Sequence, residues 1–428
     1  MSLIVFLLKY STYHTYFINI FNILFFYLLI YEFSCVKIIL LDLIYILHLE
    51  GETMDSKSLN KKKLKEFCKK EAILIIAVIL AIITSFISPP KLSYINFEVL
   101  ILLFNLMVVI TALKEFKFLD YIGTRLLHKD KSSRRIYFIM IMLTFFSSML
   151  ITDDVALITF VPLSLILSKK ANFNPVKLIV FQTIAAILGC ALTPMGSSQN
   201  LYIFTHFNLT NGQFFSATLP MTIIAFLFLL VLIFFQKDRT LDVVIEEVHV
   251  TSQKLIFSYL VLFLIVVGSV FHVINFQLAF CLIIIITFFV DKKLFLKVDY
   301  SLLITFTGFF IFIGNISAIP AVKTLISSLL VNKVHTYFIA LGLSQVISNV
   351  PTTLLLASFT HNYKALLLGV NAGGLFSLIG SMASIISYKF VIAQTNTSSL
   401  TYVKTFALYS ILGLIILIPS AYVLITCF

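Results

Sequence analysis

Charge is what this sequence has least of. Only 12% of its 428 residues are Asp, Glu, Lys or Arg, and 60% are hydrophobic, whereas an ordinary soluble domain has about 25% and about 45–50%. A soluble fold of this length needs far more polar sequence to cover its surface. Soluble enzymes and nucleic-acid-binding domains are therefore excluded, and the net charge of +12 needs another explanation.

Common functional motifs are missing as well. The five cysteines are widely spaced without a CxxC pair, and the eight histidines form no HExxH pattern, so neither a disulfide framework nor a zinc site is indicated. No P-loop is present, and residues 300–428 contain no Asp or Glu. We therefore expect no cofactor, no nucleic-acid partner and no ATP-driven transport.

Long apolar runs fill the chain instead. Segments near the ~20 residues that cross a bilayer recur throughout, and the mean hydropathy is +1.06. The sequence predicts an all-α polytopic membrane protein, with the lipid bilayer as its surroundings. Single spans are expected at residues 72–89, 96–113, 178–193, 213–235, 255–272, 276–290, 301–317, 365–388 and 405–427.

Residues 1–53 differ from the rest, because polar residues break their apolar stretch before it forms a clean span. The tripeptide Glu-Gly-Glu at residues 50–52 precedes Met54 closely and can be encoded by a purine-rich sequence of the ribosome-binding type. We expect Met54 to be the true start and residues 1–53 to be a mis-translated leader. The alternative is one or two extra N-terminal helices. A cleaved signal peptide is disfavoured, because no small-residue cleavage site follows an apolar core.

Positive charge predicts the orientation. Residues 54–70 are a basic segment, and placing them in the cytoplasm puts 25 of the 31 Lys and Arg inside. Lys91, Lys323, Lys333 and Lys364 lie outside, and the remaining two, Lys9 and Lys37, belong to the expected leader. This bias follows the positive-inside rule, and it directs the basic charge toward anionic lipid. We therefore expect a multi-pass protein of a bacterial or archaeal inner (cell) membrane with a cytoplasmic N-terminus.

Two apolar segments, 136–168 and 334–359, are interrupted by polar residues in the middle. Basic residues flank both ends of 136–168, so both ends lie inside. Each arm of about 14 residues gives ~21 Å of helix, which reaches the middle of the bilayer. We predict a re-entrant hairpin from the cytoplasm with its tip at residues 147–154, and a mirror-image hairpin at 334–359 with its tip at residues 344–351.

A shared pattern follows each hairpin: hydroxyl-x-x-Gly-Ser-x-x-polar, at 193–200 and again at 377–384. Small residues alone could serve helix packing, but in an inverted pair they indicate broken helices at the midplane. We predict an inverted-repeat transporter with two re-entrant hairpins and two broken helices. Its parts are a first repeat at 71–236, a cytoplasmic linker at 237–254 and a second repeat at 255–428. The pattern contributes the candidate site residues Thr193, Gly196, Ser197, Asn200, Ser377, Gly380 and Ser381.

The first tip contains two consecutive acids in the run Thr152-Asp153-Asp154. A carboxylate in the membrane costs roughly 2.5–3.5 kcal/mol on insertion scales, and two in succession are hard to explain by packing. One of them could cap the returning helix. As functional groups, Asp153 and Asp154 would bind a coupling Na+ or carry H+, with Thr152 beside them.

The second tip carries no charge. Pro351 suits the first turn of the returning helix, which would present backbone N–H groups to an anion. The polar side chains could also satisfy the broken backbone, and both roles are compatible. This tip completes the predicted substrate site with Ser348, Asn349, Pro351 and Thr352.

The runs SSMLITDDVALITFVPL, TPMGSSQNL and SNVPTTLLL, followed by LLLGVNAGGLFSLIGSMASIISYK, resemble the ion transporter superfamily over most of residues 70–428. That superfamily includes arsenite permeases, D-type sodium/proton antiporters and citrate or dicarboxylate transporters. The resemblance implies hairpins and broken helices that meet at a central site, and a homodimer. Arsenite-permease-like members read Asn-Asp-Val-Ala at the first tip, where Asp153 here replaces the Asn and Asp154 keeps the acid. The dicarboxylate branch carries Ser-Asn-Thr at both tips, which this chain lacks, so dicarboxylate specificity is disfavoured.

Together these features predict a secondary active transporter and no enzyme. Its small ionic substrate would be a citrate-like carboxylate or an arsenite-like oxyacid, coupled to H+ or Na+ by alternating access. The alternative is a Na+/H+ antiporter that uses Asp153 and Asp154. An intramembrane aspartyl protease would also pair two aspartates, but the chain has no GxGD. A non-transporting scaffold would not need acids at the midplane.

Overall fold

The computed structural model describes residues 71–127, 132–240, 248–375, 377–378, 380–395 and 397–427. Within these residues the chain forms 17 α-helices and no β-strand, so the predicted all-α fold class is confirmed. The expected leader at 1–53 and the basic segment at 54–70 lie outside the described residues.

Six helices are long and apolar enough to cross a membrane. They are α4 (Phe97–Glu115), α6 (Ser133–Ile151), α10 (Asn211–Phe234), α11 (Gln253–Val270), α13 (Tyr300–Ser317) and α19 (Ser399–Cys427). A further pair, α14 (Pro320–Leu329) and α15 (Lys333–Ile347), is bent by 103°. Shorter apolar helices are α3 (Ala72–Ser85), α8 (Val176–Cys190) and α18 (Met382–Gln394). The chain is therefore a multi-pass membrane protein.

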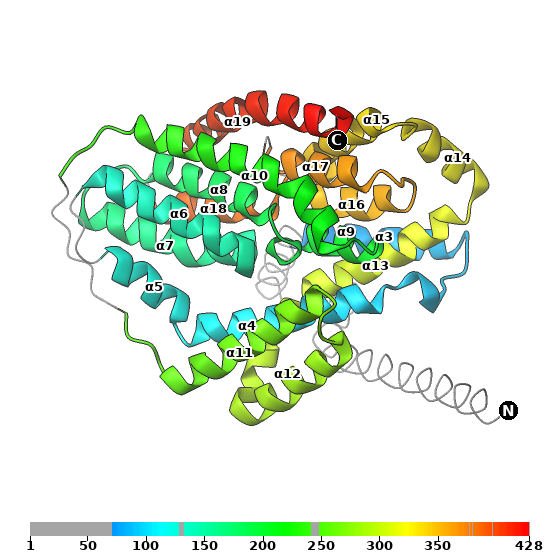
Figure 1. Cartoon of the computed structure of the whole chain (residues 1–428), viewed down its shortest axis with the longest axis horizontal. Coiled ribbons are helices and arrows are strands. Elements are labelled where there is room, and N and C mark those ends of the chain that lie inside the picture. Colours follow the sequence, from blue (N-terminus) through cyan, green and yellow to red (C-terminus); the bar gives the residue numbers. More distant parts are fainter. Residues whose placement is uncertain are drawn as a thin grey trace, which may run out of the picture. The chain divides into compact units, whose positions relative to one another are not determined.

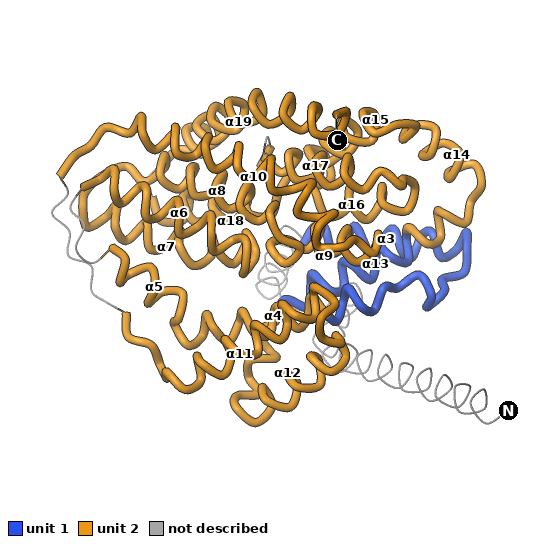
Figure 2. The backbone as a smooth tube through the Cα atoms, in the orientation of Figure 1, with its two compact units in different colours: residues 1–101, 299–312 blue, residues 102–298, 313–428 orange. Residues whose placement is uncertain are grey.

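Two compact units divide the chain (Figure 2). The described part of unit 1 contains α3, the short 3-10 helix η1 (Leu92–Tyr94), the first residues of α4 and residues 299–312 of the α13 region. Helices α3 and α13 pack closely there, because a Cβ added at Gly308 would lie 3.1 Å from the backbone of Ala77. Unit 2 contains residues 102–298 and 313–428 and holds every residue of the candidate site.

Unit 2 contains the same order of elements twice: a short amphipathic helix, a hairpin, a broken helix and a long helix (Figure 1). The first series is α5 (Phe118–Leu127), α6 with α7 (Asp153–Lys170), α8 with η2 (Pro194–Gly196) and α9 (Ser198–His206), and α10. The second is α14, α15 with α16 (Asn349–Ala357), α17 (Tyr363–Gly373) with α18, and α19. Helices α11, α12 (Phe276–Asp291) and η3 (Lys292–Lys297) lie between the two series in the chain.

Both hairpins turn at a single residue, which corrects the predicted tips. Helix α6 continues to Ile151, so most of the segment expected at the first tip is helical, and only Thr152 separates α6 from α7. Ser148 does not interrupt α6, because its hydroxyl donates a hydrogen bond within the helix, to the Phe145 carbonyl at 2.8 Å. In the second hairpin only Ser348 separates α15 from α16.

The arms of the first hairpin are also longer than predicted. Helices α6 and α7 have 19 and 18 residues, which is about 28 Å each at 1.5 Å per residue. The added length is basic: α6 begins just before Arg134 and Arg135, and α7 ends at Lys169 and Lys170. A helix that emerges into water can include charged residues. The length of the apolar segment alone therefore underestimated the length of the arms.

A hydrogen-bonded clasp joins the start of α6 to the end of α10. The Asp238 carboxylate accepts from the Ser132 hydroxyl at 2.8 Å and from the Arg134 backbone N–H at 3.2 Å. Ser133 N–H donates to the Arg239 carbonyl at 2.8 Å, and the Arg239 N–H donates back to the Ser133 hydroxyl at 2.8 Å. The clasp fixes the start of the first hairpin against the segment that follows α10.

Candidate functional site

The two tip residues share one rare backbone conformation. Thr152 has φ 72° and ψ 150°, and Ser348 has φ 75° and ψ 159°. This region is nearly confined to glycine and costs other residues roughly 1–3 kcal/mol, and such residues cluster at functional sites. Two hydroxyl residues therefore hold the same strained turn at corresponding places in the two hairpins.

Thr193 braces the first break against the first hairpin. Its hydroxyl accepts from the backbone N–H of Gly196 at 3.0 Å and donates to the carbonyl of Met149 in α6. Met149 lies three residues before the Thr152 turn, so the hydrogen bond reaches the end of the hairpin arm. One side chain thus caps the 3-10 turn of the break and satisfies a carbonyl near the tip.

Ser377 makes the same two contacts in the second half. Its hydroxyl accepts from the Gly380 N–H at 2.9 Å and donates to the carbonyl of Gln345 at 3.0 Å. Gln345 lies three residues before the Ser348 turn, the spacing seen in the first half. The hydroxyl-x-x-Gly pattern therefore marks two equivalent braces, each between a break and its own hairpin.

Glycines bring each broken helix against its hairpin at the level of the brace. A Cβ at Gly189 in α8 would lie 2.3 Å from the Phe145 carbonyl oxygen and 2.4 Å from the Ser148 hydroxyl. A Cβ at Gly373 in α17 would lie 2.5 Å from the Ser344 side chain. Both contacts are too close for any larger residue. In each half the hairpin and the broken helix therefore pack so closely that only glycine fits between them.

The Asp153 side chain interacts with residues at both breaks. Its side chain is 7% exposed, and its carboxylate interacts with the backbone N–H groups of residues 153 and 154, the Cys190 thiol and the Ser381 hydroxyl. The Cys190 thiol in turn interacts with Ser197 and lies in the electrostatic field of Asp154. Because Ser381 belongs to the second break and Cys190 precedes the first, one carboxylate connects the two halves.

The second tip contacts its own break directly. The Asn349 backbone N–H donates to the Gly380 carbonyl at 3.1 Å. Its side-chain oxygen accepts from the Val350 N–H at 3.0 Å, as the Asp153 carboxylate interacts with the N–H of residue 154. Asp153 and Asn349 therefore occupy equivalent first positions of α7 and α16, one charged and one neutral.

A buried amide pair joins the halves a second time. Asn200 in α9 donates to the carbonyls of Cys190 at 3.1 Å and Thr193 at 3.3 Å. Its side-chain oxygen accepts from the Asn371 side chain in α17 at 2.9 Å. Asn371 was not among the sequence candidates. The signal for it was an amide in the apolar run LLLGVNAGG.

Other predicted residues serve the local backbone. The Thr352 hydroxyl donates to the Ser348 carbonyl at 2.8 Å, and the Ser381 hydroxyl also accepts from the Ala383 N–H at 3.2 Å. Pro351 is buried in the first turn of α16, as expected for a helix start. These contacts satisfy the broken backbone, the alternative role considered for the second tip.

Four helices begin where the two hairpin tips meet the two breaks: α7, α9, α16 and α18. Helix α7 packs against α18, and α9 packs against α16. A helix N-terminus carries partial positive charge and exposed N–H groups, so it favours an anion. Among the described residues, no group of three or more His, Cys, Asp and Glu side chains could hold a metal ion. The predicted Na+ site would therefore combine the Asp153 or Asp154 carboxylate with hydroxyl or carbonyl oxygens, and it stays a prediction.

Apolar spans with paired hairpins and broken helices are typical of secondary transporters. Residues 67–365 match the model of the citrate transporter family. The chain belongs to the citrate transporter family, and it is therefore a transporter and no enzyme.

Individual relatives agree with this assignment. An uncharacterized transporter of Methanocaldococcus jannaschii is 34% identical over 315 residues, which are 73% of this chain and 86% of that protein. The inner membrane protein YbiR of Escherichia coli is 28% identical over 301 residues, 69% of this chain and 80% of that protein. The arsB protein of Dictyostelium discoideum is 25% identical over 167 residues, 38% of this chain and 30% of that protein.

Proposed function

We propose that this transporter is a secondary active carrier that moves a small anion across the cytoplasmic membrane together with H+ or Na+. The observation that carries the proposal is the assembly of four helix N-termini around a tip with two adjacent carboxylates. Helix N-termini supply an anion site without a positively charged side chain. The carboxylates supply a site for a cation.

The substrate class follows from this charge arrangement and from the family. A citrate-like carboxylate or an arsenite-like oxyacid is small enough to fit between helix starts and can accept hydrogen bonds from backbone N–H groups. The family name supports a carboxylate. The absence of Ser-Asn-Thr at either tip disfavours dicarboxylates.

Coupling follows from repulsion between like charges. An anion beside the ionised carboxylates of Asp153 and Asp154 is repelled, and the repulsion is strong where water is excluded. A proton or Na+ on the carboxylates removes this repulsion. The anion and the cation therefore bind better together than alone, which is the condition for cotransport.

The braces suggest which parts move together. Thr193 fixes the first break to α6, and Ser377 fixes the second break to α15. Each hairpin therefore moves with its own broken helix, and alternating access requires motion of these assemblies against the remaining helices. The positive-inside bias supports an orientation in which the N-terminus and the first hairpin's ends face the cytoplasm.

A Na+/H+ antiporter is the second candidate. Asp153 favours this function, because it is acidic whereas the equivalent residue of the second tip, Asn349, is neutral. In that case the two carboxylates exchange Na+ for H+, and no anion is carried.

Variants of the two acids test the proposal in proteoliposomes. We expect Asp154→Asn to lower anion uptake driven by a pH or Na+ gradient by about tenfold or more, within the usual range of coupling energies. Asp153→Asn reproduces the neutral residue of the second tip and should retain uptake while changing its dependence on pH. Asp291→Asn, at the end of α12 and outside the site, is the matched control and should leave uptake unchanged. Unaltered, gradient-dependent uptake by Asp154→Asn would contradict the proposal.

A further inference from the structure

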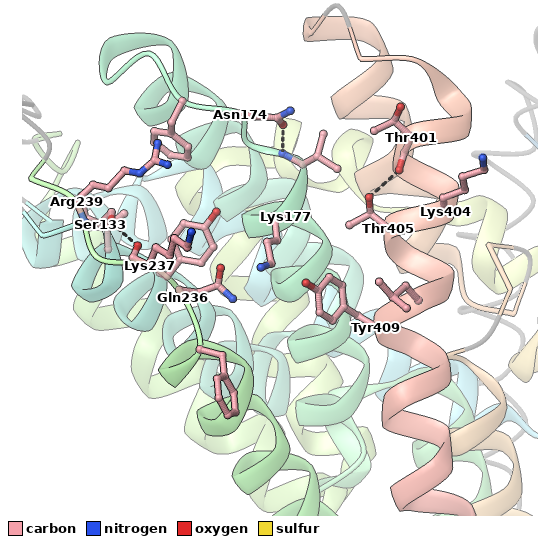
Figure 3. A pocket seen from close by; sticks show the side chains of 16 residues that line it. Ser133, Asn174, Lys177, Gln236, Lys237, Arg239, Thr401, Lys404, Thr405 and Tyr409 are labelled. Atoms are coloured by element: carbon pink, nitrogen blue, oxygen red, sulfur yellow. Dashed lines mark hydrogen bonds between the residues drawn. The ribbon is translucent and has the colours of Figure 1, made fainter.

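A second polar site lies away from the tips, at the ends of α6, α8, α10 and α19 (Figure 3). Here a cavity of about 730 Å³ opens between the starts of α6, α8 and α19 and the end of α10. Its size lies in the range of ligand pockets. Lys177 lies near the start of α8, 13 residues or about 20 Å along the helix from Cys190 at the candidate transport site. The cavity is therefore a separate site.

Positive charge dominates the lining of this cavity. Lys177, Lys237, Arg239 and Lys404 line it, and none of its described lining residues is acidic. The nearby Asp238 carboxylate is already engaged by Ser132 and the Arg134 N–H in the clasp. Four cations therefore line the cavity, with no acidic side chain among its described lining residues.

The helix ends add to this positive potential. Helices α6, α8 and α19 all begin at the cavity, and none has an acidic residue in its first turn. Lys177 is the second residue of α8, where a cation is disfavoured by the helix dipole. An anion in the cavity would offset this unfavourable position and would use the N–H groups of the helix start.

Aromatic and aliphatic side chains form the other part of the cavity. The Lys177 ammonium lies 5.5 Å from the centre of the Tyr409 ring and 5.7 Å from that of Phe181, and in the view of Figure 3 it lies between Gln236 and Tyr409. Phe235 and Leu408 also line the cavity, and they are 75% and 56% exposed. In a membrane protein such exposed apolar side chains face acyl chains. The cavity therefore combines an anion site with a lipid-facing edge.

We propose that this cavity binds the phosphate headgroup of an anionic phospholipid, with its acyl chains along Phe235 and Leu408. Basic pockets between membrane helices are suited to such headgroups. A soluble phosphate or citrate shares the anionic chemistry but would not use the exposed apolar edge, which is why the lipid is the favoured source. A bound lipid would bridge α10 and α19, the last helices of the two series.

Native mass spectrometry of the purified full chain tests this proposal, after extraction from phosphatidylcholine nanodiscs doped with phosphatidylglycerol. The native protein should retain phosphatidylglycerol. The double variant Lys177→Gln/Arg239→Gln should bind it about thirtyfold more weakly, since each cation near a membrane surface contributes about fivefold to the affinity. Lys169→Gln/Lys254→Gln removes equal charge outside the cavity and should retain the lipid.

Two further arms separate the sources of the anion. Lys177→Arg keeps the charge and should retain phosphatidylglycerol, which shows that a loss in the double variant is not a folding defect. Inorganic phosphate and citrate, added separately, should not displace the lipid from the native protein. Equal retention by the two double variants would overturn the proposal. Displacement of the lipid by phosphate or citrate would overturn the assignment to a lipid.

Discussion

The brace made by Thr193 gives a prediction that can be worked out in detail. Thr193→Val keeps the shape of the side chain and removes its hydroxyl, so the Gly196 N–H and the Met149 carbonyl each lose a partner. Gly196 and Met149 are buried. A buried polar group left unsatisfied costs about 1–3 kcal/mol. The Gly196 N–H keeps a hydrogen bond to the Thr193 carbonyl at 3.3 Å, so the main loss is at the Met149 carbonyl. Thr193→Val should therefore lower the free energy of unfolding by about 1–3 kcal/mol.

Thermal unfolding of the detergent-solubilised protein, followed by far-UV circular dichroism, measures this loss. Thr193→Ser retains the hydroxyl and should unfold near the native temperature. Thr222→Val is the matched control, because the Thr222 hydroxyl bonds only within its own helix, to the Thr218 carbonyl at 2.9 Å. A loss for Thr193→Ser equal to that for Thr193→Val would refute the brace, as would an equal loss for the control.

The equivalent brace makes the prediction symmetric. Ser377→Ala should lower the free energy of unfolding by a similar amount, since the Gly380 N–H and the Gln345 carbonyl lose their hydrogen bonds to the Ser377 hydroxyl. Ser377→Thr keeps a hydroxyl and should keep the native stability. If the braces act independently, the effects of Thr193→Val and Ser377→Ala should add within about 0.5 kcal/mol. A double variant no less stable than either single variant would show that the two contacts are not separate.

Further predictions concern packing, pH and the link between the halves. Gly189→Ala and Gly373→Ala should each destabilise by about 1–3 kcal/mol through overpacking, with reduced yield of folded protein as the readout; native-like thermal unfolding would contradict the close contacts. Hydrogen bonds from Ser132 and the Arg134 N–H hold the pKa of Asp238 below its ordinary value. The stabilising effect of the Asp238 carboxylate is therefore present above about pH 4, and it is lost as the pH falls through the lower pKa of the folded state. The stability difference between the native protein and Asp238→Asn should therefore shrink under acid, and a difference that does not vary with pH would contradict it.

Much of the fold follows from the sequence, because apolar length and charge are direct consequences of the bilayer. The long spans, both hairpins and both breaks were predicted. Helices α5 and α14 were not, because they are short and amphipathic, and their mixed residues resemble a polar loop. Each one precedes a hairpin, so they are a repeated part of the architecture that hydropathy alone does not reveal.

The site was predictable where polar residues cluster. Thr193 and Ser377 were identified because the same hydroxyl-x-x-Gly-Ser pattern follows both predicted hairpins. Their partners, Met149 and Gln345, were not, because a carbonyl acceptor depends on geometry and leaves no mark in the side chains. The meeting of Asp153 with Ser381 is likewise a tertiary contact between distant segments, and no spacing along the chain encodes it.

Proton movement in proteoliposomes tests the central claim most directly. Liposomes that contain the native protein and an internal pH-sensitive dye receive NaCl, citrate, succinate and arsenite in turn. With H+ as the coupling ion, the proposed cotransport predicts a pH change with citrate or arsenite, and none with NaCl alone. With Na+ as the coupling ion, citrate or arsenite should instead enter together with Na+, which uptake of radiolabelled Na+ measures. A pH change on adding NaCl alone would contradict anion transport and assign Asp153 and Asp154 to Na+/H+ exchange, and neither a pH change nor Na+ uptake with any anion would contradict the proposed substrate class.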